Sequence, residues 1–170
     1  MVRKELGYKV IRIIYNDFKE HFQNGNILIG GSFYYGQLGF PSSYKDVDFV
    51  VDERAEYDHI VKDIYNKYIE PHKGFLGDYR GKLTAGLEMF GDYHVDVIRN
   101  DFSDNLSPFE IIPGVFTYRQ SDKRLAFVYK EFLEAAVELK NPEYREVRIE
   151  KFKKLKSFFE LRNSESQDVL

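Results

Sequence analysis

Two short apolar segments, Ile27–Gly30 and Asp46–Asp52, constrain the fold more than any other feature of the chain. The first runs into a glycine and a serine, and the second opens with the alternation Asp-Val-Asp-Phe. Side chains two apart on a strand point to the same face, so Asp46 and Asp48 are predicted to lie side by side over an apolar layer. Neighbouring anions repel unless a cation lies between them, and carboxylate oxygens suit Mg²⁺ or Mn²⁺. The pattern therefore indicates a metal site that handles phosphate.

The composition is that of a globular domain without covalent staples. The chain has 170 residues, of which 43% are hydrophobic, and these are enough to bury a core. It has no cysteine, which excludes disulfides, thiolate catalysis and cysteine-ligated zinc. The net charge of −3 predicts no general attraction to nucleic acid or to a membrane. Since no apolar run has signal-peptide or transmembrane length, we expect a cytoplasmic protein with no membrane partner.

Hydrophobic periodicity predicts an α/β or α+β fold, in which a small mixed sheet is flanked by helices and followed by a helical C-terminal segment. Helices are predicted at 3–22, at 32–38, from Tyr57 to Pro71, and twice within 121–162; strands are predicted at 27–30, 46–52, twice within 82–99, and at 115–119. We expect one domain over residues 1–162, with a core at 1–119, C-terminal helices at 121–162 and a flexible tail at 163–170.

A third carboxylate, Asp96, stands in mid-strand between Val95 and Val97. A solitary charge at such a position needs a partner. If its strand neighbours the one that carries Asp46 and Asp48, the three carboxylates converge on one face. Three carboxylates can hold two divalent ions roughly 3.5–4 Å apart, the spacing used for in-line phosphoryl or nucleotidyl displacement.

The turn after the first strand has the residues that a phosphate site requires. Gly30 and Gly31 would let the backbone approach a triphosphate closely. The hydroxyl of Ser32 and the amides that open the next helix would donate hydrogen bonds to phosphate oxygens.

Taken in order, these segments resemble the nucleotidyltransferase superfamily, which has the polymerase-β-like fold. That family's pattern is an apolar strand ending in Gly-Gly or Gly-Ser, a short helix, an Asp-apolar-Asp/Glu strand and a later acidic strand. The segments here that follow it are Gly30-Gly31-Ser32, Asp46-Val47-Asp48 and His94-Val95-Asp96-Val97. The double glycine is similar to small stand-alone transferases, including the AbiEii-like group associated with toxin–antitoxin and phage-defence systems.

The resemblance implies roles for individual residues. Asp46 and Asp48 would bind both metal ions, and Asp96 would complete the site on the side of the attacking hydroxyl. In the AbiEii-like group a lysine on the helix after the last strand often contacts nucleotide, and Lys130 has a comparable place. The loop before the Asp-Val-Asp strand departs from the closest relatives, because it has Lys45 and two serines where an arginine is expected. We include Lys45 among the predicted phosphate-binding residues.

The function that this resemblance implies is Mg²⁺-dependent transfer of NMP from an NTP such as ATP to an acceptor that the sequence does not identify (RNA or tRNA, a protein or a small molecule). The alternative is a catalytically silent module of the same fold, which binds or regulates a partner in a toxin–antitoxin or phage–host interaction. A third interpretation is an interaction domain whose aspartates are incidental. The oligomeric state is left open.

Three further features have two interpretations each. Asp52 has the parity of Asp46 and Asp48, but it ends its strand and is predicted to be a solvated turn residue. His94 faces the same side as Asp96, either to contact phosphate or as an ordinary polar-face residue. The aromatic run 33–35 either stacks a base or belongs to the core.

Overall fold

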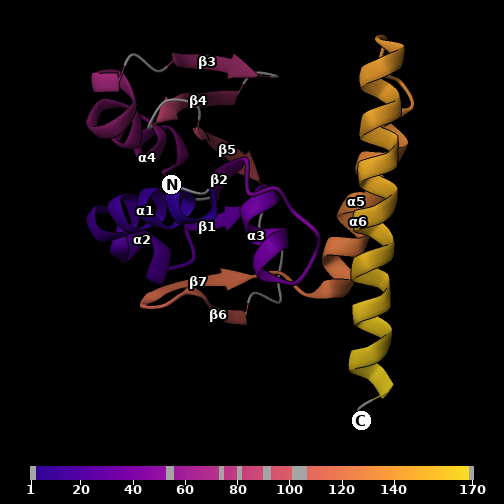
Figure 1. Cartoon of the computed structure of the whole chain (residues 1–170). Coiled ribbons are helices and arrows are strands. Elements are labelled where there is room, and N and C mark those ends of the chain that lie inside the picture. The colour runs from indigo at the N-terminus through magenta and orange to yellow at the C-terminus, as the bar shows by residue number, and fades with distance from the viewer. Residues whose placement is uncertain are drawn as a thin grey trace. The chain divides into compact units, whose positions relative to one another are not determined.

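The computed structural model describes residues 3–52, 56–72, 75–79, 82–89, 93–100 and 107–168 (Figure 1). The chain divides into two compact units, residues 1–119 and 120–170. The first holds the predicted acidic strands and the second is helical. The single domain expected from the sequence stays a prediction.

A five-stranded mixed sheet forms the centre of the first unit. Its strands follow the order β1-β2-β5-β4-β3. Among the described strands, β2 and β5 pair in parallel and each other neighbouring pair is antiparallel. The bounds are β1 (Ile27–Gly30), β2 (Asp46–Asp52), β3 (Phe75–Tyr79), β4 (Lys82–Met89) and β5 (Tyr93–Asn100). The α+β class with a small mixed sheet, predicted from the sequence, is confirmed.

Helices cover the apolar face of this sheet. The inward residues of β2 and β5, Val47, Phe49, Val95 and Val97, are fully buried. Helix α1 (Arg3–Asp17) contacts both strands, and α4 (Tyr57–Ile64) contacts β2 and β4. The helices contribute further core residues: Val10, Ile11, Ile14, Ile60, Val61 and Ile64. Alternation in the strands and helical spacing in the helices thus bury one common layer.

Some element boundaries differ from the sequence-based prediction. The helix expected at 3–22 is divided into α1 and α2 (Lys19–Gln23), because Phe18 leaves helical geometry with its ring against that of Tyr68. Helix α4 is followed by a π-helical turn, Tyr65–Ile69, and a 3-10 turn, Glu70–His72. Strand β3, which contains a glycine and is only 5 residues long, was not predicted.

A two-stranded sheet completes the first unit. It consists of β6 (Ser107–Ile112) and β7 (Val115–Arg119), and it was predicted only in its second strand. Pro108 in β6 cannot donate a ladder hydrogen bond, which weakens the strand signal. Strand β7 lies beside β1, and Tyr118 packs on Leu28 and Val50. The polar face of the large sheet is thereby covered at one end of β2.

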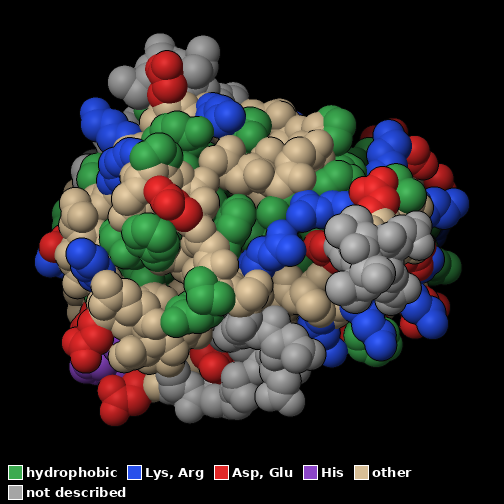
Figure 2. All heavy atoms as spheres, turned by 90° about the horizontal axis from the view of Figure 1, so that it is seen from below, with side chains coloured by type: hydrophobic (Ala, Val, Ile, Leu, Met, Phe, Trp, Pro, Cys, Tyr) green, Lys and Arg blue, Asp and Glu red, His purple; other side chains and the backbone are tan. Residues whose placement is uncertain are grey.

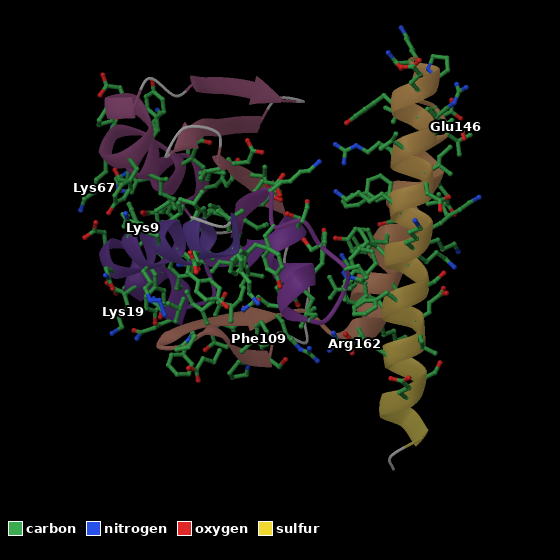
Figure 3. All side chains as sticks on the ribbon, in the orientation of Figure 1. Lys9, Lys19, Lys67, Phe109, Glu146 and Arg162 are labelled. Atoms are coloured by element: carbon green, nitrogen blue, oxygen red, sulfur yellow. The ribbon has the colours of Figure 1, made fainter. Side chains whose placement is uncertain are left out.

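The second unit is a pair of helices, α5 (Asp122–Ala136) and α6 (Pro142–Asp168). Ser121 caps α5, and its hydroxyl accepts a hydrogen bond from the Arg124 amide at 3.1 Å. The ring of Tyr129 stacks on Phe159, with centroids 5.7 Å apart. Arg162, labelled in Figure 3, lies 3.7 Å from the carboxylate of Asp122. Within the described chain, no helix is long and apolar enough to cross a membrane.

The C-terminal segment is helical further than the sequence suggested. A flexible tail was expected from Asn163, whereas α6 continues to Asp168. Neither glycine nor proline occurs after Pro142 to end the helix, and the Ser164 hydroxyl donates to the Glu160 carbonyl one turn back, at 3.1 Å. Two lysines of this helix are paired along it: Lys154 contacts Glu150, and Lys156 contacts Glu160.

Replacing Phe49 by alanine should lower the free energy of unfolding by about 3–5 kcal/mol, because the ring is fully buried and its loss leaves a cavity. Urea titration followed by circular dichroism measures this. The matched control is Phe116→Ala, whose ring is 50% exposed and whose loss should change stability by less than about 1 kcal/mol. Equal losses in the two variants would contradict the assignment of the core.

Candidate functional site

The strand register brings the predicted carboxylates together. In the parallel pair β2–β5, Asp48 is the register partner of Asp96, and Asp46 is the partner of His94. Registered residues of neighbouring strands share a face, so the three aspartates lie on the face opposite the buried valines. All three are half-buried. The strand neighbourhood on which the sequence-based site depended is therefore present.

Glycines flank the central pair of aspartates. Across four strands, one register row reads Gly30, Asp48, Asp96 and Gly86. Glycine has no side chain, so each carboxylate has a bare backbone position on its outer side. Like charges at adjacent register positions are unfavourable by themselves. Two adjacent carboxylates in one row favour a cation near them.

Gly31 fixes the place of the Asp48 carboxylate. Its φ of +70° lies in the left-handed region, which side-chain-bearing residues rarely adopt. A Cβ atom at this position would stand 1.9 Å from Oδ2 of Asp48, well inside contact distance. Residue 31 must be glycine for two reasons. The turn from β1 into α3 (Gly31–Gln37) needs a positive φ, and the Asp48 carboxylate occupies the place of a side chain.

Ser32 holds the Asp46 carboxylate. Its hydroxyl donates to Oδ1 of Asp46 at 2.6 Å and lies 3.3 Å from the main-chain carbonyl oxygen of the same residue. The sequence indicated instead that this hydroxyl donates to phosphate. That contact stays a prediction, and the observed role of Ser32 is to orient a carboxylate. The second oxygen of Asp46 keeps its own lone pairs for a further ligand.

Helix α3 is anchored to the rest of the first unit from below. Phe33 is fully buried. The ring of Tyr34 meets that of Phe109 on β6 at 6.1 Å; Phe109 is labelled in Figure 3. The amide of Gln37 donates to the Ile111 carbonyl at 2.7 Å. These contacts settle the two interpretations of the aromatic run in part: Phe33 and Tyr34 belong to the core, and Tyr35 is half-buried.

The donor chemistry fits a hard divalent cation. The three aspartates offer oxygen ligands alone, the set preferred by Mg²⁺ and Mn²⁺. Within the part of the chain that the structure describes, no three His, Cys, Asp or Glu side chains are already grouped so as to hold a metal ion. The backbone therefore places the ligands, while the Asp46 carboxylate is turned toward Ser32.

The remaining predicted phosphate-binding residues are two exposed lysines. Lys45 is exposed in the loop that leads into β2, and Lys130 is exposed on α5 in the second unit. Asp52 corrects an expectation: it is 8% exposed rather than solvated. The reason is that β2 stays in the sheet to its last residue, where Asp52 pairs with Asn100.

The structure also adds residues that the sequence did not suggest. Glu88 on β4 is the register partner of His94, which places it in the same row as Asp46. Tyr44, two residues before Asp46, has a φ of 52° and packs on α3. Strands β4 and β5 were both predicted, but an exact register has no signal in one sequence. The sequence likewise gives no signal that a tyrosine has a positive φ.

Replacing Gly31 by alanine should destabilise the protein by about 1–3 kcal/mol more than replacing Gly39 by alanine, because the added methyl must displace the Asp48 carboxylate. Gly39 is the matched control: its φ is also positive, at +97°, but nothing lies within 4 Å of an added Cβ. Urea titration of both variants isolates the contact from the backbone strain. Equal losses of unfolding free energy in the two variants would show that the Asp48 carboxylate can move aside without destabilising the protein.

Comparisons with known proteins give little beyond a distant likeness. No protein-family model matches the chain, and no curated protein does. Among solved structures, it is similar to an antigenic nucleotidyltransferase-like protein from Paracoccidioides brasiliensis, with 12% sequence identity and a TM-score of 0.49. The match covers 86% of this chain and 73% of that one.

Proposed function

We propose that this chain is a Mg²⁺- or Mn²⁺-dependent nucleotidyltransferase, which moves NMP from an NTP to an acceptor hydroxyl. One observation carries the proposal: the register row in which Asp48 and Asp96 lie side by side between two glycines, next to the Gly30–Gly31 turn. A core sheet has no need of paired carboxylates. A site for a cation and a triphosphate needs both the carboxylates and the bare backbone beside them.

Asp46, Asp48 and Asp96 would hold the divalent ions. When bound, the ions supply neutralisation of the triphosphate charge and favour ionisation of the acceptor hydroxyl. The protein itself would position the three carboxylates. Gly31 seats the Asp48 carboxylate, Ser32 orients that of Asp46, and Asp96 faces Asp48 from the neighbouring strand. Catalysis would come chiefly from orientation and charge.

The proposed reaction balances without a further co-reactant. The acceptor oxygen attacks the α-phosphorus of the NTP and forms a new P–O bond, while the bond from that phosphorus to the bridging oxygen breaks. Pyrophosphate leaves, and the proton of the acceptor hydroxyl passes to solvent. Gly30 and Gly31 would let the main chain lie close to the phosphates, and we place Lys45 among the further phosphate contacts. The phosphate contact of Lys130, which belongs to the second unit, stays a prediction of the sequence.

The charge pattern of one face favours a locally recognised acceptor. Acidic and basic side chains are interspersed on the face shown in Figure 2, in keeping with the net charge of −3. Extended polyanion tracks bind chiefly through many phosphate contacts by Lys and Arg. An RNA end, a protein hydroxyl or a small molecule would therefore be held by a short stretch of contacts near the aspartates.

Each NTP with Mg²⁺ should raise the melting temperature if the site binds nucleotide. Ligand at about a hundred times its dissociation constant adds roughly 2.7 kcal/mol of stability, and for a chain of this size that corresponds to a shift of about 5–10 °C. Differential scanning fluorimetry with each NTP, with and without Mg²⁺, measures the effect and shows which base is preferred.

The variant for this test is Asp48→Ala, which should abolish the Mg²⁺-dependent shift. Asp58→Ala is the matched control, since it removes an exposed aspartate on α4 and should keep the full shift. Each variant is compared with its own melting temperature without ligand. If wild-type protein shows no shift with any nucleotide, the proposed function fails.

Turnover separates an enzyme from a silent module of the same chemistry. With an NTP labelled at the α-phosphate, an active enzyme should release pyrophosphate and transfer label to total RNA, to protein or to the small-molecule fraction. Asp96→Asn should bind Mg²⁺–NTP more weakly and lose transfer altogether, because its carboxylate lies on the acceptor side in this proposal. Tight binding by wild-type protein without any transfer would favour the regulatory alternative.

A further inference from the structure

Tyr44 occupies a backbone conformation that a tyrosine seldom adopts. It is the one non-glycine residue in the described chain with positive φ, at 52°. For a bulky side chain this conformation is disfavoured, and it persists only where the surroundings hold it. Such residues concentrate at functional sites. Tyr44 precedes Asp46 by two positions, so its conformation sets the direction in which the chain enters β2.

The ring of Tyr44 is held against α3. It lies directly over Gly36, where an added Cβ would stand 2.4 Å from the ring carbon Cζ. It meets the buried Phe33 ring edge-to-face at 5.4 Å, and the Lys4 ammonium lies 5.1 Å from its centre. The hydroxyl donates to Oε1 of Gln37 at 3.2 Å. Because Gly36 has no side chain, the Tyr44 ring can occupy the space over it, and we call this space the seat of the ring.

The main chain around Tyr44 is tied to the same helix. The Tyr44 amide donates to the hydroxyl of Ser42 at 3.2 Å, and that hydroxyl donates to the Ser32 carbonyl oxygen at 2.6 Å. The Ser32 hydroxyl in turn donates to Oδ1 of Asp46 at 2.6 Å. The chain of contacts thus starts at Tyr44 and returns to Asp46 through α3.

We propose that Tyr44 is the positioning residue of the acidic site: clamped on α3 through Gly36 and Ser42, it sets the direction of the Asp46 carboxylate. This inference rests on the proposed function in that Asp46 is taken as a metal ligand. Tyr44 touches neither substrate nor metal in this scheme. It acts through the loop 38–45, which it holds in one conformation so that Asp46 enters β2 beside Ser32.

The test measures Mn²⁺ binding to the full chain by the electron paramagnetic resonance signal of free Mn²⁺. Tyr44→Gly keeps access to positive φ but removes the ring, and it should weaken Mn²⁺ binding by about tenfold or more, the effect of losing a group that orients a ligand. Tyr44→Phe should retain most of the affinity, because the ring still fills the seat over Gly36. Ser42→Ala should weaken binding as well.

Two comparisons make the result specific to the clamp. The double variant Ser42→Ala/Tyr44→Gly should lose less than the two single losses combined, since both act in one chain of contacts. Phe40→Ala is the matched control: its half-buried ring lies in the same loop and packs on Tyr35 at 6.3 Å, outside that chain of contacts. It should bind Mn²⁺ within about twofold of wild type, like a change away from the site.

A metal-free readout keeps this inference separate from the proposed function. The ¹³Cγ resonance of Asp46, recorded at pH 7, should move in Tyr44→Gly and Ser42→Ala and stay in place in Phe40→Ala, while melting curves show that all are folded. If wild-type protein binds no Mn²⁺, the proposed function fails and this resonance alone judges the clamp. An unmoved resonance, or wild-type Mn²⁺ affinity in folded Tyr44→Gly, would overturn the inference.

Discussion

Parallel pairing of β2 with β5, from Asp46–His94 to Asp52–Asn100, underlies the rest of the first unit. It sets two apolar rows against α1 and α4, which become the core, and it turns the alternate rows outward. Because the register aligns Asp48 with Asp96, the same hydrogen bonds that build the sheet also bring two carboxylates together. A shift of β5 by one residue would turn its buried side chains to the acidic face and Asp96 to the core face. Fold and site therefore depend on one register.

Helix α3 orients the carboxylates that this register brings together. Only 7 residues long, it is fixed by the buried Phe33 and by the Gln37 bond to Ile111. From that base it presents Gly31 to Asp48 and Ser32 to Asp46. Short helices gain little from intrinsic propensity, and their stability comes from packing. The contacts beneath α3 therefore support the site, although they lie outside it.

Much of this arrangement was predictable from the sequence, because alternation and glycine turns act locally. The Asp-Val-Asp strand and the Gly-Gly turn each follow from residues within a few positions. The errors come from tertiary contacts that leave no local signal. Asp52 is buried because its strand remains paired, and β6 forms in spite of Pro108. Tyr44 keeps a positive φ in a fold where Gly36 makes room for its ring.

The crossover between β2 and β5 has a kinetic consequence. Strand β5 can pair with β4 through a short connection, whereas its pairing with β2 requires closure of the whole segment between them. Contacts of high sequence separation slow folding, because loop closure must precede them. We therefore expect the two central carboxylates to meet late in the folding reaction. A cation that bridges them would chiefly lengthen the lifetime of the folded chain, with little effect on how fast it folds.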